Sequence, residues 1–145
     1  MPEASNSVVI DRPVADVFVF LGNAENDRRW RSGVVELQRV SGEGVGTRYH
    51  QVVSGPGGRK VNADIEIIEF TPNSRIAFRT TTGPVRPEGS YDLSPQDGGT
   101  KVTFKLSATV GGLKSLFMGS MVQKTMNNEV AALSELKRVL ESSTL

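Results

Sequence analysis

The spacing of hydrophobic residues changes twice along the chain and divides it into three parts. In the first part, the i, i+3, i+4, i+7 spacing of one helix face is followed by Val14, Val17, Phe18 and Leu21. From Val34 onward, hydrophobic and polar residues mostly alternate, as in strands that bury one face. After residue 112 the helical spacing returns and continues to about Glu141. The pattern predicts a block of strands between two helical parts.

Two short helices are expected after a first strand. The run SVVID, residues 7–11, has the β-branched residues of a strand, and Pro13 follows at a position suited to the first turn of a helix. Gly22 is placed to end that helix. Asn23 can cap a second helical turn over Ala24 to Trp30, because acidic residues in the first turn favour a helix N-terminus.

Turn residues divide the alternating part into strands, as in an antiparallel meander. Turns at 41–44, 55–58 and 71–73 separate the segments VVELQRV, TRYHQVV, KVNADIEIIEF and RIAFRTTT. A fifth strand is predicted from Pro84 to Leu93, at an edge or with a bulge, because two prolines weaken it. The last strand, KVTFKLSATV, alternates strictly and places on one face Val102, Phe104, Leu106, Ala108 and Val110.

The segment after residue 112 predicts one long helix that packs across the sheet. One broad arc of this helix holds Met121, Val122, Met126, Val130, Leu133, Leu136, Val139 and Leu140. Glu129 falls on the same stripe, where a carboxylate would be costly to bury without a partner. Two explanations stay open: Glu129 points into a cavity and orients a ligand, or it reaches the edge and pairs with an Arg or Lys from the sheet.

Composition and charge narrow the class of protein. The 145 residues are enough for one compact domain, which we expect to span 1–145 with an ordered core of about 5–142. A net charge of +1, with both signs spread along the chain, disfavours a nucleic-acid partner. Without cysteine there is no disulfide and no thiolate nucleophile. We expect a cytoplasmic protein, because the longest apolar run is too short to span a membrane and MPEASNS does not resemble a secretory leader.

Several segments match a known family in their order and spacing. They are VVIDRPVADVFVFL, Trp30, GEGVGTRY, EIIEFTPNSRIAFRT, GSYDLSPQDGGTKVTF, GGLKSLF and AALSELKRVLES. In these segments the chain resembles the polyketide cyclase/dehydrase and lipid-transport family of the START-like (SRPBCC) superfamily. The resemblance implies the α+β helix-grip fold, in which a curved antiparallel sheet of about seven strands wraps around a long C-terminal helix. Two small helices would close one end, and a cavity would remain between sheet and helix.

The resemblance implies that this cavity binds a small hydrophobic molecule. We expect the lining to be Trp30, Tyr49, Gln51, Ile65, Ile67, Phe78, Thr80, Tyr91, Phe104, Phe117, Met118, Met121, Val122 and Met126. The ring of Trp30 would turn into the cavity mouth while Arg29 and Arg31 face solvent, or Trp30 would wedge the small helices onto the sheet. The methionines suit either an adaptable cavity wall or an irregular core.

Catalytic motifs are absent from the sequence. His50 is the only histidine, which excludes a two-histidine metal site, and we expect neither a metal nor a cofactor. The glycines at 42, 44 and 46 precede a strand and therefore do not form a phosphate loop. We expect Tyr49 to face inward, which places His50 on the solvent side of its strand. If the chain is an enzyme, its candidate catalytic residues are Tyr49, Tyr91 and Glu129.

Three functions stay open. We favour a carrier or sensor of a lipid-like or aromatic, polyketide-like molecule, because each candidate catalytic residue also has a structural explanation. The resemblance implies the alternative of a polyketide cyclase or aromatase, which would fold a reactive polyketone and steer its dehydration. The third is a protein-interaction domain that uses the edge at residues 84–88. We expect a monomer or a weak homodimer.

Overall fold

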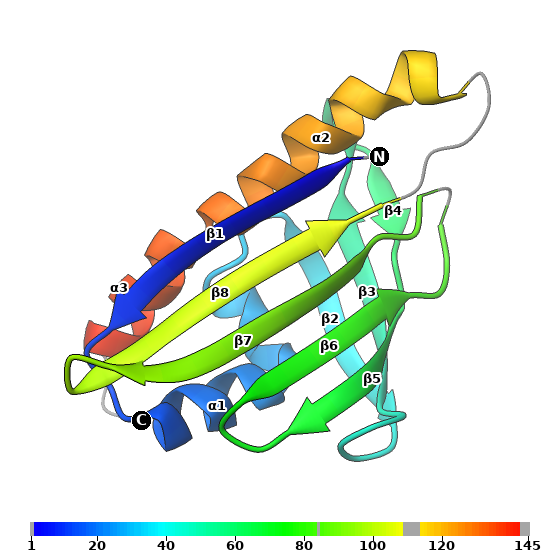
Figure 1. Cartoon of the computed structure of the whole chain (residues 1–145). Helices are drawn as coiled ribbons and strands as arrows, with labels where there is room; N and C mark the ends of the chain where they lie inside the picture. The colour runs from blue at the N-terminus through cyan, green and yellow to red at the C-terminus, as the bar shows by residue number, and fades with distance from the viewer. Residues whose placement is uncertain (1, 84, 109–113, 143–145) are drawn as a thin grey trace.

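A strongly curved antiparallel sheet, with long helices packed along it, forms the protein (Figure 1). The structure, a computed structural model, describes residues 2–83, 85–108 and 114–142. Among these residues, seven strands follow one another across the sheet in the order β1-β8-β7-β6-β5-β3-β2, and the short β4 pairs with β3. The predicted α+β helix-grip architecture is confirmed.

The elements follow the predicted order of strand, two short helices, strands and C-terminal helix. The strands are β1 (Glu3–Ile10), β2 (Val34–Ser41), β3 (Arg48–Ser54), β4 (Lys60–Asn62), β5 (Ile65–Thr71), β6 (Arg75–Thr80), β7 (Glu88–Gln96) and β8 (Gly99–Ser107). The α-helices are α1 (Val14–Gly22), α2 (Lys114–Ala131) and α3 (Leu133–Ser142). The 3₁₀ helices are η1 (Ala24–Arg29) and η2 (Pro56–Gly58). As predicted, Asn23 caps η1, since its side chain accepts a hydrogen bond from the Glu25 N–H (3.1 Å).

Strand β8 shows how the alternation of the sequence divides the sheet into two faces. Its Val102, Phe104 and Leu106 are buried in the core with residues from the helices. Lys101 and Lys105, which alternate with them, are exposed. The concave face is therefore dry and packs against the helices, as the period of two predicts.

The long antiparallel pairs β1–β8 and β7–β8 hold the sheet together at one side. Both run in unbroken register, and Glu3 of β1 lies opposite Ser107 of β8. The turn between β7 and β8 places Asp97 and Gly98 at positive φ (52° and 80°). Two such residues in succession match the right-handed twist of a tight hairpin, so the turn favours this register.

One predicted strand is divided in two. KVNADIEIIEF is not continuous, because β4 ends at Asn62 and β5 begins at Ile65. Between them, Asp64 accepts a hydrogen bond from the backbone N–H of Gln51 on β3 (3.0 Å), and the Ala63 N–H donates to the Gln51 carbonyl (2.8 Å). These contacts replace regular strand pairing at the break.

The strand predicted from Pro84 to Leu93 begins only at Glu88, and Pro84 lies outside the described residues. The prediction that this strand forms an edge is wrong, since β7 lies between β6 and β8. Pro87 immediately precedes β7 and so removes no N–H from its ladder. The interaction surface expected at 84–88 is therefore not a free sheet edge.

The predicted single C-terminal helix is divided at Ala132 into α2 and α3. At the break, the Ala132 N–H donates to the Glu129 carbonyl (3.1 Å) and the Glu135 N–H donates to the Ala132 carbonyl (2.9 Å). These bonds have the three-residue spacing of a tighter turn, which interrupts the regular helical ladder.

The two helices differ in how deeply they pack. Helix α3 buries Leu133, Leu136, Val139 and Leu140. Among residues 120–131, Met126 and Val130 are the only buried side chains, and Val122 is half-buried. Met121, predicted on the buried arc, is 45% exposed. Hydrophobic packing therefore holds α3 more firmly than the described part of α2.

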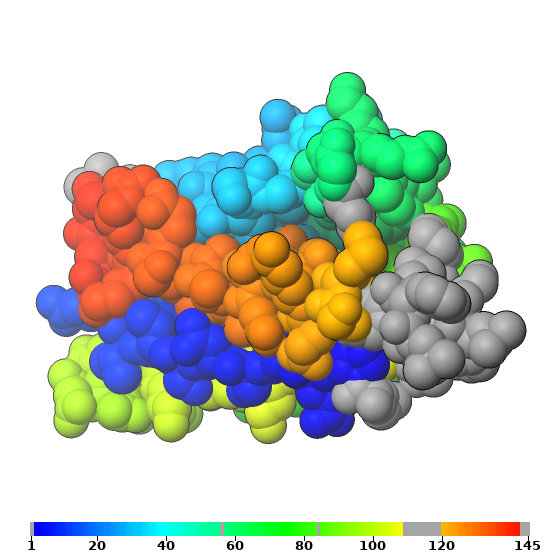
Figure 2. All heavy atoms as spheres, turned by 90° about the horizontal axis from the view of Figure 1, so that it is seen from above, coloured from blue at the N-terminus to red at the C-terminus, as the bar shows by residue number. Residues whose placement is uncertain are grey.

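Helices α2 and α3 lie between β1 on one side and the segment of η1 and β2 on the other (Figure 2). Polar contacts attach them to β1: Asn6 donates to the Val130 carbonyl (3.0 Å), and Lys137 donates to the Val9 carbonyl (2.6 Å). The opposite side of α2 faces the segment that follows η1, where a polar cluster lies.

Replacing Leu136 with Ala is expected to lower the free energy of unfolding by about 2 to 5 kcal/mol, because the side chain is fully buried and its loss leaves a cavity. Chemical denaturation measures the change. The matched control is Val19→Ala on α1, where the side chain is 73% exposed and the expected loss is below about 0.5 kcal/mol. Similar losses in the two variants would contradict this packing.

Candidate functional site

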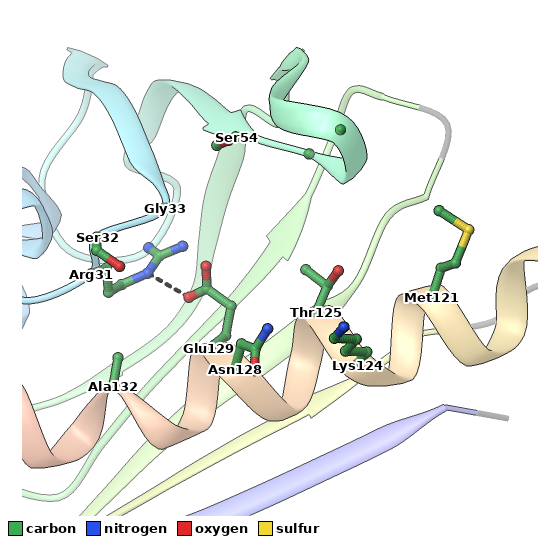
Figure 3. Close-up of a pocket in the computed structure, with 12 residues that line it drawn as sticks. Arg31, Ser32, Gly33, Ser54, Met121, Lys124, Thr125, Asn128, Glu129 and Ala132 are labelled. Carbon is green, nitrogen blue, oxygen red and sulfur yellow. Dashed lines mark hydrogen bonds and ion pairs between the residues drawn. The ribbon is translucent and has the colours of Figure 1, made fainter.

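A buried arginine lies where the segment after η1 meets β3 and α2. Arg31 donates from Nε to Glu129 Oε2 (2.8 Å), and from Nη1 to Asp27 Oδ2 (3.0 Å) and Gln51 Oε1 (3.1 Å). The Arg31 and Glu129 side chains point toward one another across the gap between the loop and α2 (Figure 3). Arg31 is 9% exposed. We call these four residues the Arg31 cluster.

Local backbone bonds and neighbouring strands position the cluster. Asp27 and Arg31 are four residues apart, and the Arg31 N–H also donates to the Asp27 carbonyl (2.7 Å). The Gln51 amide is fixed because its Nε2 donates to the carbonyl of Ala63, in the break between β4 and β5 (2.8 Å). Glu129 lies in the last turn of α2. The cluster therefore joins three segments that are far apart in the sequence.

Burial and charge act against each other in the cluster. Burial is the largest effect on Asp27 and raises its pKa from the usual 3.8 to about 6, although the charge and hydrogen bond of Arg31 act in the opposite direction. Burial alone would lower the pKa of Arg31, but the charges of Glu129 and Asp27 outweigh it and raise that pKa. Arg31 is therefore a permanent cation, whereas Asp27 gains a proton in mildly acidic solution.

Two donors beside the cluster are buried without a hydrogen-bond partner in the part of the chain that the structure describes: the Tyr91 hydroxyl and the Trp30 indole N–H. The indole lowers the pKa of Asp27 slightly but does not reach it with hydrogen-bonding geometry. Burial, followed by the charge of Asp27, raises the pKa of Tyr91 well above its usual value, so the hydroxyl keeps its proton. Unpaired buried donors are costly and favour a site for an acceptor.

Aromatic rings surround these donors. Tyr91 stacks on Phe104 with ring centroids 4.5 Å apart, and Trp30 meets each of these rings edge-on at 6.1 Å. Trp30 is 2% exposed and thus packs η1 onto the concave face of β7 and β8. The Tyr91 hydroxyl is held in place by packing, because its ring has little room to turn.

Two spaces adjoin the Arg31 cluster. An inner cavity of about 20 Å³, enough for about one water molecule, lies between the small helices and the sheet, and its lining includes Asp27, Arg31, Gln51 and Tyr91 beside Ile65 and Phe78. An outer cleft of about 630 Å³ lies between α2, the segment that precedes β2 and the end of β3, and its lining mixes polar and apolar surface. Arg31 lines both spaces and separates them.

Most of the predicted lining residues come together in the interior. Buried there are Trp30, Tyr49, Gln51, Ile65, Ile67, Thr80, Tyr91, Phe104 and Met126, while Phe78 and Val122 are half-buried. Met121 does not join them and lines the outer cleft instead. The side chains of Phe117 and Met118 lie outside the described residues. That these residues bind a ligand stays a prediction.

Tyr49 and His50 lie on the faces of β3 that the sequence predicts, and Glu129 has a charged partner. Tyr49 faces inward as predicted, and its hydroxyl accepts a hydrogen bond from the Ala24 N–H (3.3 Å). His50 lies on the other face of β3, with Nδ1 2.8 Å from Asp64 Oδ1. Glu129 pairs with an arginine, but this arginine follows η1 and does not belong to the sheet.

The prediction that Arg31 faces solvent is wrong, and the predicted lining omits Asp27. Arg29 is exposed as predicted, with its guanidinium over the ring of Phe20 (5.1 Å to the centroid). One feature of the sequence could have indicated that Arg31 is paired: Asp27 and Arg31 have opposite charges, lie four residues apart and flank the only tryptophan. In the described parts of the chain, no group of three or more His, Asp or Glu side chains is placed to hold a metal ion.

The curved sheet, the short helices after β1 and the long C-terminal helices define a START-like domain. The chain belongs to the family described as polyketide cyclase / dehydrase and lipid transport, whose model matches residues 1–141. A search of curated proteins gave no match. Within the described residues, no helix is both long and apolar enough to cross a membrane.

Solved structures from several sources share the fold. TTHA0849 from Thermus thermophilus is 27% identical, with a TM-score of 0.83 over 99% of this chain and 100% of its own. A START superfamily protein from Mycobacterium smegmatis is 13% identical, with a TM-score of 0.74 over 95% of this chain and 98% of its own. The di-domain ARO/CYC protein BexL from the BE-7585A biosynthetic pathway is 20% identical, with a TM-score of 0.74 over 99% of this chain and 48% of its own.

Replacing Asp27 with Asn tests the electrostatics of the cluster. The folded protein holds the Asp27 proton more tightly than the unfolded chain does, so the contribution of this group to stability is full below pH 3.8 and is lost as the pH rises to about 6. Relative to Asp27→Asn, the wild type should therefore lose up to about 3 kcal/mol of unfolding free energy across this range. Denaturation at a series of pH values measures the difference, and a constant difference would contradict the raised pKa.

Proposed function

We propose that this domain binds a small, mostly apolar molecule that carries a hydrogen-bond-accepting oxygen, and that it acts as a carrier or sensor of that molecule. The observation that carries the proposal is the unpartnered Tyr91 hydroxyl beside the Arg31 cluster in an otherwise apolar interior. A carbonyl, phenol or carboxyl oxygen of a ligand would accept the hydrogen bond that the Tyr91 hydroxyl does not make with any residue that the structure describes. Family membership agrees with such a role.

Arg31 supports the same position for the ligand oxygen. Its Nε and Nη1 are occupied by Glu129, Asp27 and Gln51, while Nη2 has no hydrogen-bond partner among the described residues. Arg31 and Tyr91 line the same inner cavity. A charged donor next to a neutral one favours an oxygen with partial negative charge, such as a conjugated ketone. The aromatic rings of Trp30 and Phe104 would pack against the apolar part of the ligand.

Binding requires the interior to widen. Organic ligands occupy pockets of about 300 to 1,000 Å³, whereas the inner cavity is about 20 Å³. Helix α2 is the element best suited to move, because Met126 and Val130 are its only buried side chains within residues 120–131. Displacement of α2 would also expose the half-buried Val122 to the enlarged cavity. We infer that the ligand fills the space that this displacement opens.

A polyketide cyclase is the second candidate, and Tyr91 is the observation that favours it. Of the three predicted catalytic residues, Tyr49 is hydrogen-bonded to the Ala24 N–H and Glu129 is paired with Arg31. Tyr91 keeps a protonated, unpartnered hydroxyl near a permanent cation, and such a pair could stabilise an enolate oxygen. Carrier and enzyme differ in the fate of the ligand, because cyclisation with dehydration would release water and lower the mass of a polyketone.

Titration with 9-fluorenone, and with fluorene as the analogue without the carbonyl, tests the proposed role of Tyr91. The Tyr91→Phe variant should bind fluorenone about three- to tenfold more weakly, because one hydrogen bond is lost, and should bind fluorene unchanged. Calorimetry measures both affinities, and the single tryptophan, which contacts Tyr91, gives a second signal. The variant should keep its stability, since the hydroxyl has no hydrogen-bond partner to lose among the residues that the structure describes. Equal effects on the two probes would refute the role of Tyr91.

A further inference from the structure

The outer cleft lies outside the interior, and the proposed binding of an apolar molecule there gives the cleft no role. It is formed by the segment after η1, the end of β3 with the following glycine-rich turn, and one face of α2 (Figure 3). Its lining mixes polar and apolar surface, and its hydroxyl and amide groups come from Ser32, Ser54, Thr125 and Asn128. Its volume of about 630 Å³ is that of a small-molecule site. The cleft therefore has the size and the hydrogen-bonding groups for a polar ligand group.

The unpaired charges at this cleft are positive. Lys124 lines it and makes no ion pair with any residue that the structure describes. An adjoining hollow shares Ser32 and Asn128 with the cleft and adds the exposed Arg28, which also lacks an ion pair within the described ranges. The carboxylates are engaged, since Glu129 pairs with Arg31, and Glu135 in the hollow pairs with Arg138. The free charge favours an anionic group.

The floor of the cleft has open space because residue 33 is a glycine. A Cβ atom at Gly33 would meet a single atom within 4 Å, Glu129 Oε1 at 3.6 Å. A side chain at this position would thus project beside the Arg31–Glu129 pair, into the space between the loop and α2. Neither backbone strain nor a clash explains the glycine, so its effect is to leave the cleft open.

We propose that the outer cleft binds the anionic head group, a carboxylate or a phosphate, of an amphiphile whose apolar part lies in the interior. This inference rests on the proposed function for the position of the apolar part. Arg31 lines both spaces, so a molecule that extends past the Arg31–Glu129 pair places one end in each. Lys124 and the hydroxyls bind the head group, while the hydrocarbon or ring system contacts the aromatic side chains within.

Three probes that share one chain length test the head-group site: dodecanoate, dodecyl phosphate and dodecanol, each below its micelle concentration. Calorimetry on the full chain should give both anions about tenfold lower Kd values than the alcohol, because charge-assisted hydrogen bonds are the stronger ones. Lys124→Glu should remove this difference in affinity and leave the Kd of the alcohol unchanged. Lys101→Glu is the matched control on the exposed face of β8 and should change none of the three affinities. Gly33→Leu places a side chain in the cleft and should therefore weaken the binding of both anions.

The outcomes separate this inference from the proposed function. Equal affinities for the three probes, or an anion preference that survives Lys124→Glu, would overturn the head-group site and leave binding in the interior intact. Failure of all three probes to bind, while 9-fluorenone still binds, would overturn the head-group site alone, and failure of fluorenone as well would overturn both proposals. Inorganic phosphate is the fourth probe. If it binds as tightly as dodecyl phosphate, the cleft is a site for free anions, and the proposal that it binds an amphiphile is wrong.

Discussion

The burial of one guanidinium is the constraint on which the polar part of this structure depends. Arg31 cannot lose its charge, so the fold must supply negative partners wherever it places this side chain. Asp27 comes from the same short helical segment, but Glu129 comes from α2, 98 residues away in the sequence. The position of α2 opposite the segment after η1 and the charge balance of the interior therefore depend on each other. Separating α2 from the sheet would leave a buried cation with one carboxylate fewer.

This constraint gives α2 an unusual attachment. Helix α3 is held by a row of buried aliphatic side chains, whereas α2, over residues 120–131, is held by two buried side chains, contacts to β1 and the ion pair to Arg31. Hydrophobic packing loses free energy with every small separation, but an ion pair that borders a polar cleft can exchange its partner for water or for another anion. The break at Ala132 lies between these two modes of attachment.

The sequence predicted those features that depend on neighbouring residues. Alternation in β8, the cap at Asn23 and the glycine-rich turns are local, and each lies where expected. The break at Ala132 carries no glycine or proline to signal it. The interior position of β7 was concealed by prolines that fall just before the strand.

Charged residues were the hardest to place. Arg31 lies in a run of charge that is typical of a solvated surface, and its burial depends on a glutamate from the other end of the chain. That glutamate was recognised as anomalous on its helix, and pairing with an arginine was among its explanations. The partner could not be named, because sequence separation carries no information on which arginine the fold brings near. The sequence therefore predicted most of the apolar residues that are buried around the candidate site, but it did not predict the ion pairs of Arg31 at its centre.

The pairing of β1 with β8 bears on how the protein folds during synthesis. Glu3 lies opposite Ser107, so β1 is synthesised long before β8, the strand with which it pairs in its native register. Until then its edge is exposed, and the concave face has no C-terminal helix to cover it. Contacts of such large sequence separation slow folding and prolong the exposure of unpaired strands. The exposed, charged Glu3 on β1 makes this strand less prone to pair with another chain during that interval.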